Sequence, residues 1–545
     1  MPHKEINTIA QRVQKWLDGP YDEDTKKEIL RLGKDDPKAL SDAFFKDLSF
    51  GTGGMRGLMG VGTNRMNVYT IRKATQGLAN YIKKNNISAF VGYDVRHHSK
   101  EFAEETARVL AGNGIKVFLA KDICPTPLVS FGCRHFGCQT AIMITASHNP
   151  SQYNGYKVYW SDGAQVVSPH DVDIMNEVKK VEDKILLAPL PSPLICEVGG
   201  ELDRIYLAEV KKLQLRKDLG NIDLKILYTP LHGTGIRLIP KALHSWGYKN
   251  VHLVLEQSAP NGEFPSAPSP NPEEKESLAL GVKQLIKDKG DILIATDPDA
   301  DRIGVVCSKE SYQFTGNQIA CLLLQHICKS ITLPPKATFV KSIVTTDLFR
   351  KIAEKHKGLC VDVLTGFKYI GEKIAAWEKT PSEHQYVFGA EESCGYLFGT
   401  FVRDKDAISS ACLIAEAAAL AKKEGITLLD RLYQIYEEYG VHRERLVNLA
   451  FTDSEEGMKQ MEEVMRSLRK NPPQVIEGQK VAKIEDFLFS SDVMRLWLED
   501  QTKITIRPSG TEPKIKIYIE VVGKPGSIQH CDERLQAIKN YFQNQ

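Results

Sequence analysis

Short apolar runs alternate with helical segments along most of this chain, and each run stops at a polar or glycine-rich turn. The clearest run is AIMI at residues 141–144, which is followed at once by TASHNP at 145–150. Such a run is typical of a buried strand. Alternating strands and helices predict open, largely parallel sheets, in which ligands bind at the carboxyl ends of the strands. Functional residues are therefore expected in the polar turns.

The same rhythm continues over several hundred residues. Strands are predicted at 89–93, 115–119, 141–144, 224–228, 251–255, 291–295, 338–344, 360–363 and 386–388, and an alanine-rich helix at 407–421. Ser99 is predicted to cap the helix between the first two strands. The last hundred or so residues differ, because a helix near 454–469 is followed by strands at 503–506 and 514–521.

At 545 residues the chain is too long for one hydrophobic core. A proline-rich stretch, LAPLPSPL at 187–194, indicates the first boundary between domains. We expect mixed, mostly parallel α/β domains at 1–204, 205–315 and 316–437, and a smaller α+β domain at 438–545. Residues 1–48 are predicted to form a helical extension of the first domain.

The balance of 71 basic and 69 acidic side chains indicates neither a nucleic-acid-binding protein nor one attracted to anionic membranes. The N-terminal residues are charged and no apolar run approaches the length of a membrane span, so a cytoplasmic protein is expected. The eleven cysteines are scattered and mostly lie in apolar segments, which predicts buried structural thiols.

Asp297, Asp299 and Asp301 alternate along the turn after the predicted strand at 291–295. Three carboxylates that converge on one point repel one another unless a cation neutralises them. Hard oxygen ligands of this kind suit Mg²⁺. A solvated turn is the alternative, but a buried strand rarely ends in three exposed acids. The spacing therefore predicts a magnesium site.

Ser147 and His148 occupy the turn after 141–144. A serine hydroxyl becomes a good nucleophile only when a base, charge or metal activates it, and by itself the pair also fits ordinary loop chemistry. Arg56 follows a glycine-rich stretch at 50–54, where backbone N–H groups can approach a ligand closely. A flexible turn explains that stretch equally well.

Two further turns can bind polar ligands. Residues 507–511, RPSGT, combine a guanidinium, two hydroxyls and a glycine in a possible anion cradle, although a β-turn with a surface arginine has the same sequence. Glu391 and Ser393 can bind vicinal sugar hydroxyls, and a capping turn explains them as well.

Taken together, these motifs resemble the α-D-phosphohexomutase superfamily over nearly the whole chain. The motifs are TASHNP, YNGYK, TDPDADR, EESCG and RPSGTEPK, in this order and at domain-sized spacing. The resemblance implies three related α/β domains and a smaller C-terminal domain around a central cleft. Phe367 in TGFK resembles the branches that act on glucose and on pentose phosphates. The opening FGTGGMRGLMGVGTNRMN and the glucose-type loop EES favour glucose phosphates.

The resemblance also implies roles for individual residues. Ser147 would be the phosphoserine, His148 and Lys157 the alternative acid/base residues, and Arg56 a further cation of the active site. Ser147, Asp297, Asp299 and Asp301 would bind one Mg²⁺, with Arg302 beside the phosphoserine. The substrate-binding residues would be Thr365, Gly366, Lys368, Glu391 and Ser393 for the sugar, and Lys405, Arg507, Ser509, Gly510 and Thr511 for the non-reacting phosphate.

The activity implied is the interconversion of α-D-glucose 1-phosphate and glucose 6-phosphate through glucose 1,6-bisphosphate, which also acts as primer. Mannose and pentose phosphates are alternative substrates on the same scaffold. A metal-dependent sugar phosphatase, with Asp297 as nucleophile and Asp299 as acid, is an alternative from another class. Small sugar phosphates are the expected partners of a monomer or dimer.

Overall fold

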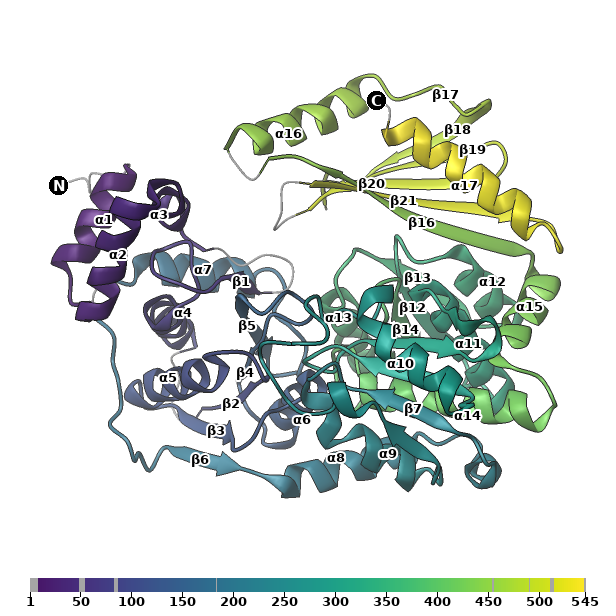
Figure 1. Cartoon of the computed structure of the whole chain (residues 1–545), viewed down its shortest axis with the longest axis horizontal. Helices are drawn as coiled ribbons and strands as arrows, with labels where there is room; N and C mark the ends of the chain where they lie inside the picture. The colour runs from purple at the N-terminus through teal and green to yellow at the C-terminus, as the bar shows by residue number, and fades with distance from the viewer. Residues whose placement is uncertain are drawn as a thin grey trace.

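The computed structural model describes residues 8–48, 54–82, 87–182, 184–452, 455–489, 491–509 and 514–543. Within these ranges the chain forms four sheets in succession, here called sheets I to IV (Figure 1). Sheets I to III are mixed and carry helices, whereas sheet IV is antiparallel. The predicted fold class is thus confirmed. In the part of the chain that the structure describes, no helix is both long and apolar enough to cross a membrane.

Three helices precede sheet I: α1 (Ile9–Asp18), α2 (Glu23–Asp35) and α3 (Pro37–Phe44). Asp36 caps α3, and Pro37 occupies its first turn, where a missing N–H group costs nothing. The helices enclose a small core of their own around Trp16 and Phe44. Tyr69 of the following helix packs against Trp16, with ring centroids 5.7 Å apart, and so attaches this helical segment to the first domain.

Sheet I has the strand order β1-β5-β4-β2-β3-β6. Its strands are β1 (Met55–Leu58), β2 (Ser88–Tyr93), β3 (Lys116–Ala120), β4 (Thr140–Ile144), β5 (Tyr153–Trp160) and β6 (Ile195–Val198), and its helices are α4 (Val68–Tyr81), α5 (Ser99–Gly112), α6 (Thr126–His135) and α7 (His170–Lys180). Phe90 and Val91 point into different hydrophobic cores, because helices cover both faces of the sheet. This explains the uninterrupted apolar runs.

Ser99 is not the cap of α5, contrary to the prediction. The helix begins at Ser99 itself, and His98 stands at the cap position in a left-handed conformation with φ of 60°. The Ser99 hydroxyl donates to Asp94 at 2.7 Å instead. A buried carboxylate therefore captures the hydroxyl that capping would have used.

Sheet II has the order β11-β10-β9-β7-β8. Its elements are α8 (Gly200–Lys212), η1 (Lys217–Asn221), β7 (Ile226–Thr229), η2 (Thr234–Arg237), α9 (Ile239–Ser245), β8 (Val251–Leu253), η3 (Leu255–Gln257), α10 (Lys275–Lys287), β9 (Ile292–Thr296), β10 (Ile303–Cys307), η4 (Lys309–Ser311) and β11 (Tyr312–Gln313). The strand predicted at 251–255 ends at Leu253, because Leu255 is 73% exposed and begins a 3-10 turn.

Sheet III has the order β13-β12-β14-β15. Its elements are α11 (Gly316–Ser330), β12 (Ala337–Ser342), α12 (Asp347–Lys355), β13 (Leu359–Val363), α13 (Lys368–Lys379), β14 (Gln385–Glu391), β15 (Gly395–Phe398), α14 (Ala407–Lys423) and α15 (Leu428–Tyr439). The strand predicted at 338–344 stops at Ser342, where the chain turns toward α12. By contrast, β14 continues to Glu391 by pairing with β15.

Sheet IV, with the order β16-β21-β20-β19-β18-β17, forms the C-terminal domain. Its strands are β16 (Val441–Ala450), β17 (Val475–Ile476), β18 (Gln479–Asp486), β19 (Met494–Leu498), β20 (Lys503–Pro508) and β21 (Lys514–Gly523), with helices α16 (Glu455–Lys470) and α17 (Ile528–Gln543). In Figure 1 this domain lies beside sheet III, and β16 follows directly from α15.

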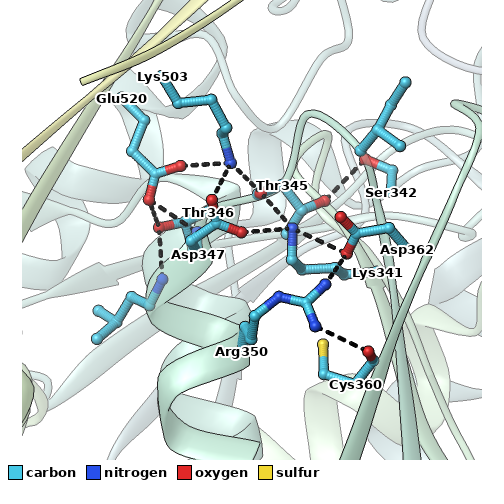
Figure 2. Close-up of polar contacts among 12 residues, drawn as sticks. Lys341, Ser342, Thr345, Thr346, Asp347, Arg350, Cys360, Asp362, Lys503 and Glu520 are labelled. Carbon is cyan, nitrogen blue, oxygen red and sulfur yellow. Dashed lines mark hydrogen bonds and ion pairs between the residues drawn. The ribbon is translucent and has the colours of Figure 1, made fainter. Parts of the chain in front are cut away.

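A buried network of charges, here called the C-terminal anchor, joins sheet IV to the third domain (Figure 2). It consists of Lys341, Asp347, Lys503 and Glu520. Lys503 lies 2.9 Å from Asp347 and 2.6 Å from Glu520, and Lys341 lies 3.0 Å from Asp347. Glu520 also accepts hydrogen bonds from the Thr346 hydroxyl at 2.9 Å and the Asp347 N–H at 2.7 Å. Each charge thus has a partner from the other domain or its own.

Candidate active site

Ser147 lies in the turn after β4, where its side chain meets the second domain. The residue is 2% exposed and has a left-handed φ of 54°, a conformation that costs a non-glycine residue about 1–3 kcal/mol. Its Oγ donates to Oδ2 of Asp297 at 2.7 Å, and its N–H donates to the Thr145 hydroxyl at 2.8 Å. The serine turn and the aspartate turn, far apart in sequence, therefore form one site.

Asp297, Asp299 and Asp301 lie in the turn between β9 and β10 and are all buried. One oxygen from each carboxylate falls within 4.8 Å of the others. Within the described chain, the Oδ1 atoms of Asp299 and Asp301 are buried without a hydrogen-bond partner. Burial and the two neighbouring carboxylates hold the pKa of Asp297 well above its usual value. The hard oxygen donors and the two orphaned atoms fit a divalent cation such as Mg²⁺.

Two buried lysines already balance part of this negative charge. The Lys157 ammonium donates to Asp299 at 2.7 Å and to Asp301 at 3.1 Å. Lys405 lies 3.2 Å from Asp301 and 3.1 Å from Asp404. Although burial opposes it, Lys157 and Lys405 hold the pKa of Asp301 below its usual range. Lys405, expected beside the non-reacting phosphate, thus lies against the aspartate triad.

His148, Arg56 and Arg302 lie around Ser147. The Nδ1 atom of His148 is 3.2 Å from the Ser147 hydroxyl. Desolvation and the nearby guanidinium groups of Arg302 and Arg56 hold the pKa of His148 well below its usual value. Arg56, on β1, donates to the Asn149 side chain at 2.7 Å. The Arg302 N–H donates to Asp297 at 3.0 Å, which holds Arg302 beside the triad.

The predicted sugar-binding residues gather in two neighbouring turns of the third domain. The carboxylate of Glu391, at the end of β14, accepts the Gly366 N–H at 2.8 Å, and burial raises its pKa. Gly366 has φ of 121°, which favours glycine. The Thr365 hydroxyl is buried without a partner in the described chain, and Ser393 is half-buried in the turn after Glu391.

Lys368 begins α13 and lies 3.3 Å from Asp171 of the first domain. Arg507, on β20, has a buried Nε without a hydrogen-bond partner among the described residues. Ser509 follows β20, and its N–H donates to the Lys514 carbonyl at 2.8 Å. Gly510 and Thr511 lie outside the described residues, as does most of the glycine-rich stretch before Arg56.

Sequence reasoning missed three buried residues around the centre. Thr126, at the start of α6, donates its hydroxyl to Asp299 at 2.6 Å. Asp94 and Arg96 follow β2 and contact the serine turn. Both lie directly after a predicted parallel strand, where functional side chains are expected, so their position was the available signal.

Comparisons with known proteins identify the family. Four family profiles match the chain in order, described as phosphoglucomutase/phosphomannomutase alpha/beta/alpha domain I at residues 47–184, domain II at 204–310, domain III at 315–439, and the C-terminal domain at 446–537. The chain is 37% identical to a phosphoglucomutase of Staphylococcus haemolyticus over 526 residues, covering 92% of this chain and 94% of the relative. A Staphylococcus aureus phosphoglucomutase is 37% identical over 510 residues, covering 88% of this chain and 90% of the relative.

Solved structures show the same fold at low sequence identity. The open form of the Paramecium exocytosis-sensitive phosphoprotein pp63/parafusin, a phosphoglucomutase, superposes with a TM-score of 0.71 at 18% identity, covering 91% of this chain and 94% of that one. A phosphoglucomutase/phosphomannomutase family protein of Burkholderia thailandensis gives 0.66 at 17% identity, with coverage of 90% and 97%. With its four matching domains and its close sequence relatives, this chain belongs to the α-D-phosphohexomutase superfamily and is a phosphohexomutase of the phosphoglucomutase-like type.

Proposed function

We propose that this protein is a phosphoglucomutase that interconverts α-D-glucose 1-phosphate and glucose 6-phosphate through a phosphoserine at Ser147. The observation that carries the proposal is the 2.7 Å hydrogen bond from the Ser147 hydroxyl to Asp297. It brings a single serine nucleophile to a cluster of three carboxylates. The names of the relatives, phosphoglucomutases at 37% identity, support glucose phosphates as the substrates.

Asp297, Asp299, Asp301 and an oxygen of the Ser147 phosphate would hold one Mg²⁺. When bound, the cation withdraws charge from the phosphoryl oxygens, which lowers the barrier to phosphoryl transfer. Lys157 and Lys405 offset part of the negative charge by pairing with Asp299 and Asp301. The side chain of Arg302 offers a further positive charge beside the same phosphate.

The transfer itself has two halves. In the first, the bond from phosphorus to Ser147 Oγ breaks, and a new bond forms to O6 of glucose 1-phosphate. The hydroxyl proton of O6 passes to a base, and the electron pair of the broken bond stays on Oγ. In the second half, glucose 1,6-bisphosphate has turned end for end, its 1-phosphoryl group returns to Oγ, and O1 regains the proton. Glucose 6-phosphate leaves and the phosphoserine is restored.

We propose His148 rather than Lys157 as the base. The Nδ1 atom of His148 lies 3.2 Å from Ser147 Oγ. The phosphoryl group moves between this Oγ atom and the sugar. Lys157 Nζ donates to two carboxylates, so its donors are engaged in holding the triad. A general base must lie within hydrogen-bond reach of the proton that it abstracts.

The remaining predicted residues would bind the substrate. We assign the sugar hydroxyls to Glu391 and Ser393, with Thr365, Gly366 and Lys368 beside them. Arg507, Ser509, Gly510 and Thr511 would bind the phosphate that does not react, because this phosphate alternates between the 1- and 6-positions and needs charge-assisted contacts rather than a tight pocket. Lys405, from its place beside Asp301, would face the reacting phosphate.

The test is a coupled assay with glucose 1-phosphate, mannose 1-phosphate and ribose 1-phosphate, each with Mg²⁺ and its bisphosphate primer. The expected result is the highest kcat/KM for glucose 1-phosphate and a phosphorylated Ser147 peptide in a tryptic digest. Preference for another sugar would reassign the substrate within the family. Release of inorganic phosphate with a phosphoaspartate would contradict the mutase mechanism, as would near-normal turnover by Ser147→Ala.

A further inference from the structure

Arg96 lies at the centre of the backbone contacts that shape the serine turn. Its guanidinium donates to the carbonyl oxygens of Ser147 at 2.7 Å, Pro150 at 2.8 Å and Tyr153 at 3.0 Å, and also to that of Asn149. One planar side chain thus satisfies four carbonyls in a turn that has few backbone hydrogen bonds of its own. A lysine ammonium at this position lacks the planar fork of donors.

Asp94 holds Arg96 in place and also contacts the same turn. The Arg96 side chain is fully buried, and its Nε lies 3.3 Å from Asp94 Oδ2. Asp94 accepts the Thr145 hydroxyl at 2.6 Å, and Thr145 in turn accepts the Ser147 N–H. The pair therefore acts on Ser147 from both sides, through its carbonyl oxygen and through its N–H. Such a buried pair keeps its geometry because either charge alone would be strongly unfavourable.

The Arg96 guanidinium also contacts the second domain. Its central carbon lies 5.0 Å from the ring centroid of Phe264, which is fully buried. The loop around Phe264 packs closely here, since a Cβ added at Gly262 would come within 2.8 Å of the Val95 carbonyl oxygen. This loop belongs to the domain that supplies Asp297, the hydrogen-bond partner of Ser147.

We infer that Arg96 is a positioning residue for phosphoryl transfer, which sets the backbone of Ser147 and fixes the serine turn against the domain that carries the aspartate triad. This inference rests on the proposed phosphoserine role of Ser147. Arg96 itself does not touch the reacting atoms. Its loss displaces Ser147 relative to the triad, and an error of about 1 Å in such geometry lowers the rate by about 100-fold.

The test compares the full-length variants Arg96→Lys, Phe264→Leu and Arg108→Lys. Arg108 is the matched control, because it also donates to a backbone carbonyl, that of Ala188 at 3.2 Å, but lies away from the site. Glucose 1-phosphate turnover gives kcat and KM, phosphate release gives the share of phosphoserine lost to water, and thermal melting reports folding. Mass spectrometry of the Ser147 peptide reports phosphorylation.

For Arg96→Lys we expect kcat to fall by about 100-fold, KM to stay within about threefold, and a larger share of phosphoryl groups to reach water. Phe264→Leu should lower kcat by about tenfold, and Arg108→Lys should leave it unchanged. A folded Arg96→Lys variant with kcat within about threefold of the wild type overturns the inference. If Arg96→Lys does not fold, Phe264→Leu is the deciding variant. A Phe264→Leu variant with the kcat and the share of hydrolysis of the wild type overturns the inference.

The same experiment separates this inference from the proposed function. If wild-type Ser147 carries no phosphate during turnover, the proposed function fails. If Ser147 is phosphorylated and Arg96→Lys transfers its phosphoryl group normally, only the inference about Arg96 fails.

Discussion

Thr126 of the first domain binds Asp299 of the second at two points. Its hydroxyl donates to the carboxylate at 2.6 Å, and its N–H donates to the Asp299 carbonyl at 2.8 Å. One residue therefore orients both the side chain and the backbone of a predicted metal ligand. Hydrogen bonds of this kind set ligand direction and are worth about 10- to 100-fold in metal affinity.

The first prediction follows from that contact. Thr126→Val removes the hydroxyl and preserves the shape and the backbone bond, so we expect the Mg²⁺ concentration for half-maximal activity to rise by about 10-fold or more. Magnesium titration of the activity measures it. Thr106→Val is the matched control, since the Thr106 hydroxyl is buried without a partner in the described chain. An unchanged magnesium requirement in Thr126→Val would show that the contact does not orient the ligand.

A second prediction concerns the lysine that pairs with two aspartates of the triad. Lys157→Met leaves Asp299 and Asp301 with less compensation in a buried site, which should lower the free energy of unfolding by about 3–5 kcal/mol without divalent cation. Added Mg²⁺ should restore part of that loss by binding the folded state. Denaturant unfolding with EDTA and with Mg²⁺ measures both values. Lys212→Met, in an exposed pair with Glu209, should change stability by no more than about 1 kcal/mol.

A third prediction uses the buried thiol of Cys124. Burial raises its pKa from an ordinary value of about 9 to about 12. Between these values the folded state binds more protons than the unfolded state, so stability declines as pH rises. Below about pH 9 the thiol does not make the free energy of unfolding depend on pH. Above about pH 9 it lowers the free energy of unfolding by about 1.4 kcal/mol per pH unit.

Urea unfolding of the wild type and Cys124→Ala from pH 7 to pH 10 tests this. The difference in unfolding free energy between the two proteins at pH 7 and pH 8 gives the constant cost of the smaller side chain. Above about pH 9 that difference should shrink by about 1.4 kcal/mol per unit, because only the wild type has a thiol to ionise. A constant difference up to pH 10 contradicts the prediction.

The C-terminal anchor provides the fourth prediction. Glu520→Gln keeps the shape of the side chain but leaves the buried Lys503 charge with Asp347 as its single acidic partner among the residues that the structure describes. We expect a loss of about 3 kcal/mol or more in stability, with cleavage by protease first near the junction of α15 and β16. The exposed pair of Arg466 and Glu463 gives the control, Glu463→Gln, which should behave as the wild type. Equal protease resistance of Glu520→Gln and the wild type would refute this role.

Local sequence features were sufficient to predict the two strands that precede Ser147 and Asp297. The run before Ser147 and the run before Asp297 are uncharged and buried on both faces, so their position could be predicted without knowledge of their neighbours. By contrast, β14 extends to Glu391 only because β15 pairs with it, and the end of such a strand depends on a partner further along the chain. Ser99 likewise does not cap its helix, because its hydroxyl donates to Asp94 instead, and residue spacing does not reveal such a contact.

The position of Lys405 shows the same limit at the site. The motif around Lys405 indicated a positive charge at the site but not which group that charge would contact. In the structure the Lys405 ammonium points toward Asp301. Gly395 makes this possible, because a Cβ there would lie 2.0 Å from the Lys405 side chain. Arg96 was overlooked although it follows a predicted strand, because its four acceptors are backbone carbonyls and the sequence does not show which carbonyls a side chain will meet.

Ser147 and Asp297 are 150 positions apart in the sequence, and this separation determines how early in protein synthesis the centre can form. At about 5–20 residues per second, roughly 8 to 30 seconds pass between the emergence of the serine turn and that of the aspartate it bonds. Lys405 appears later still. During that interval the serine lacks Asp297, Arg302 and Lys405, so this centre is complete only after the second and third domains have been synthesised.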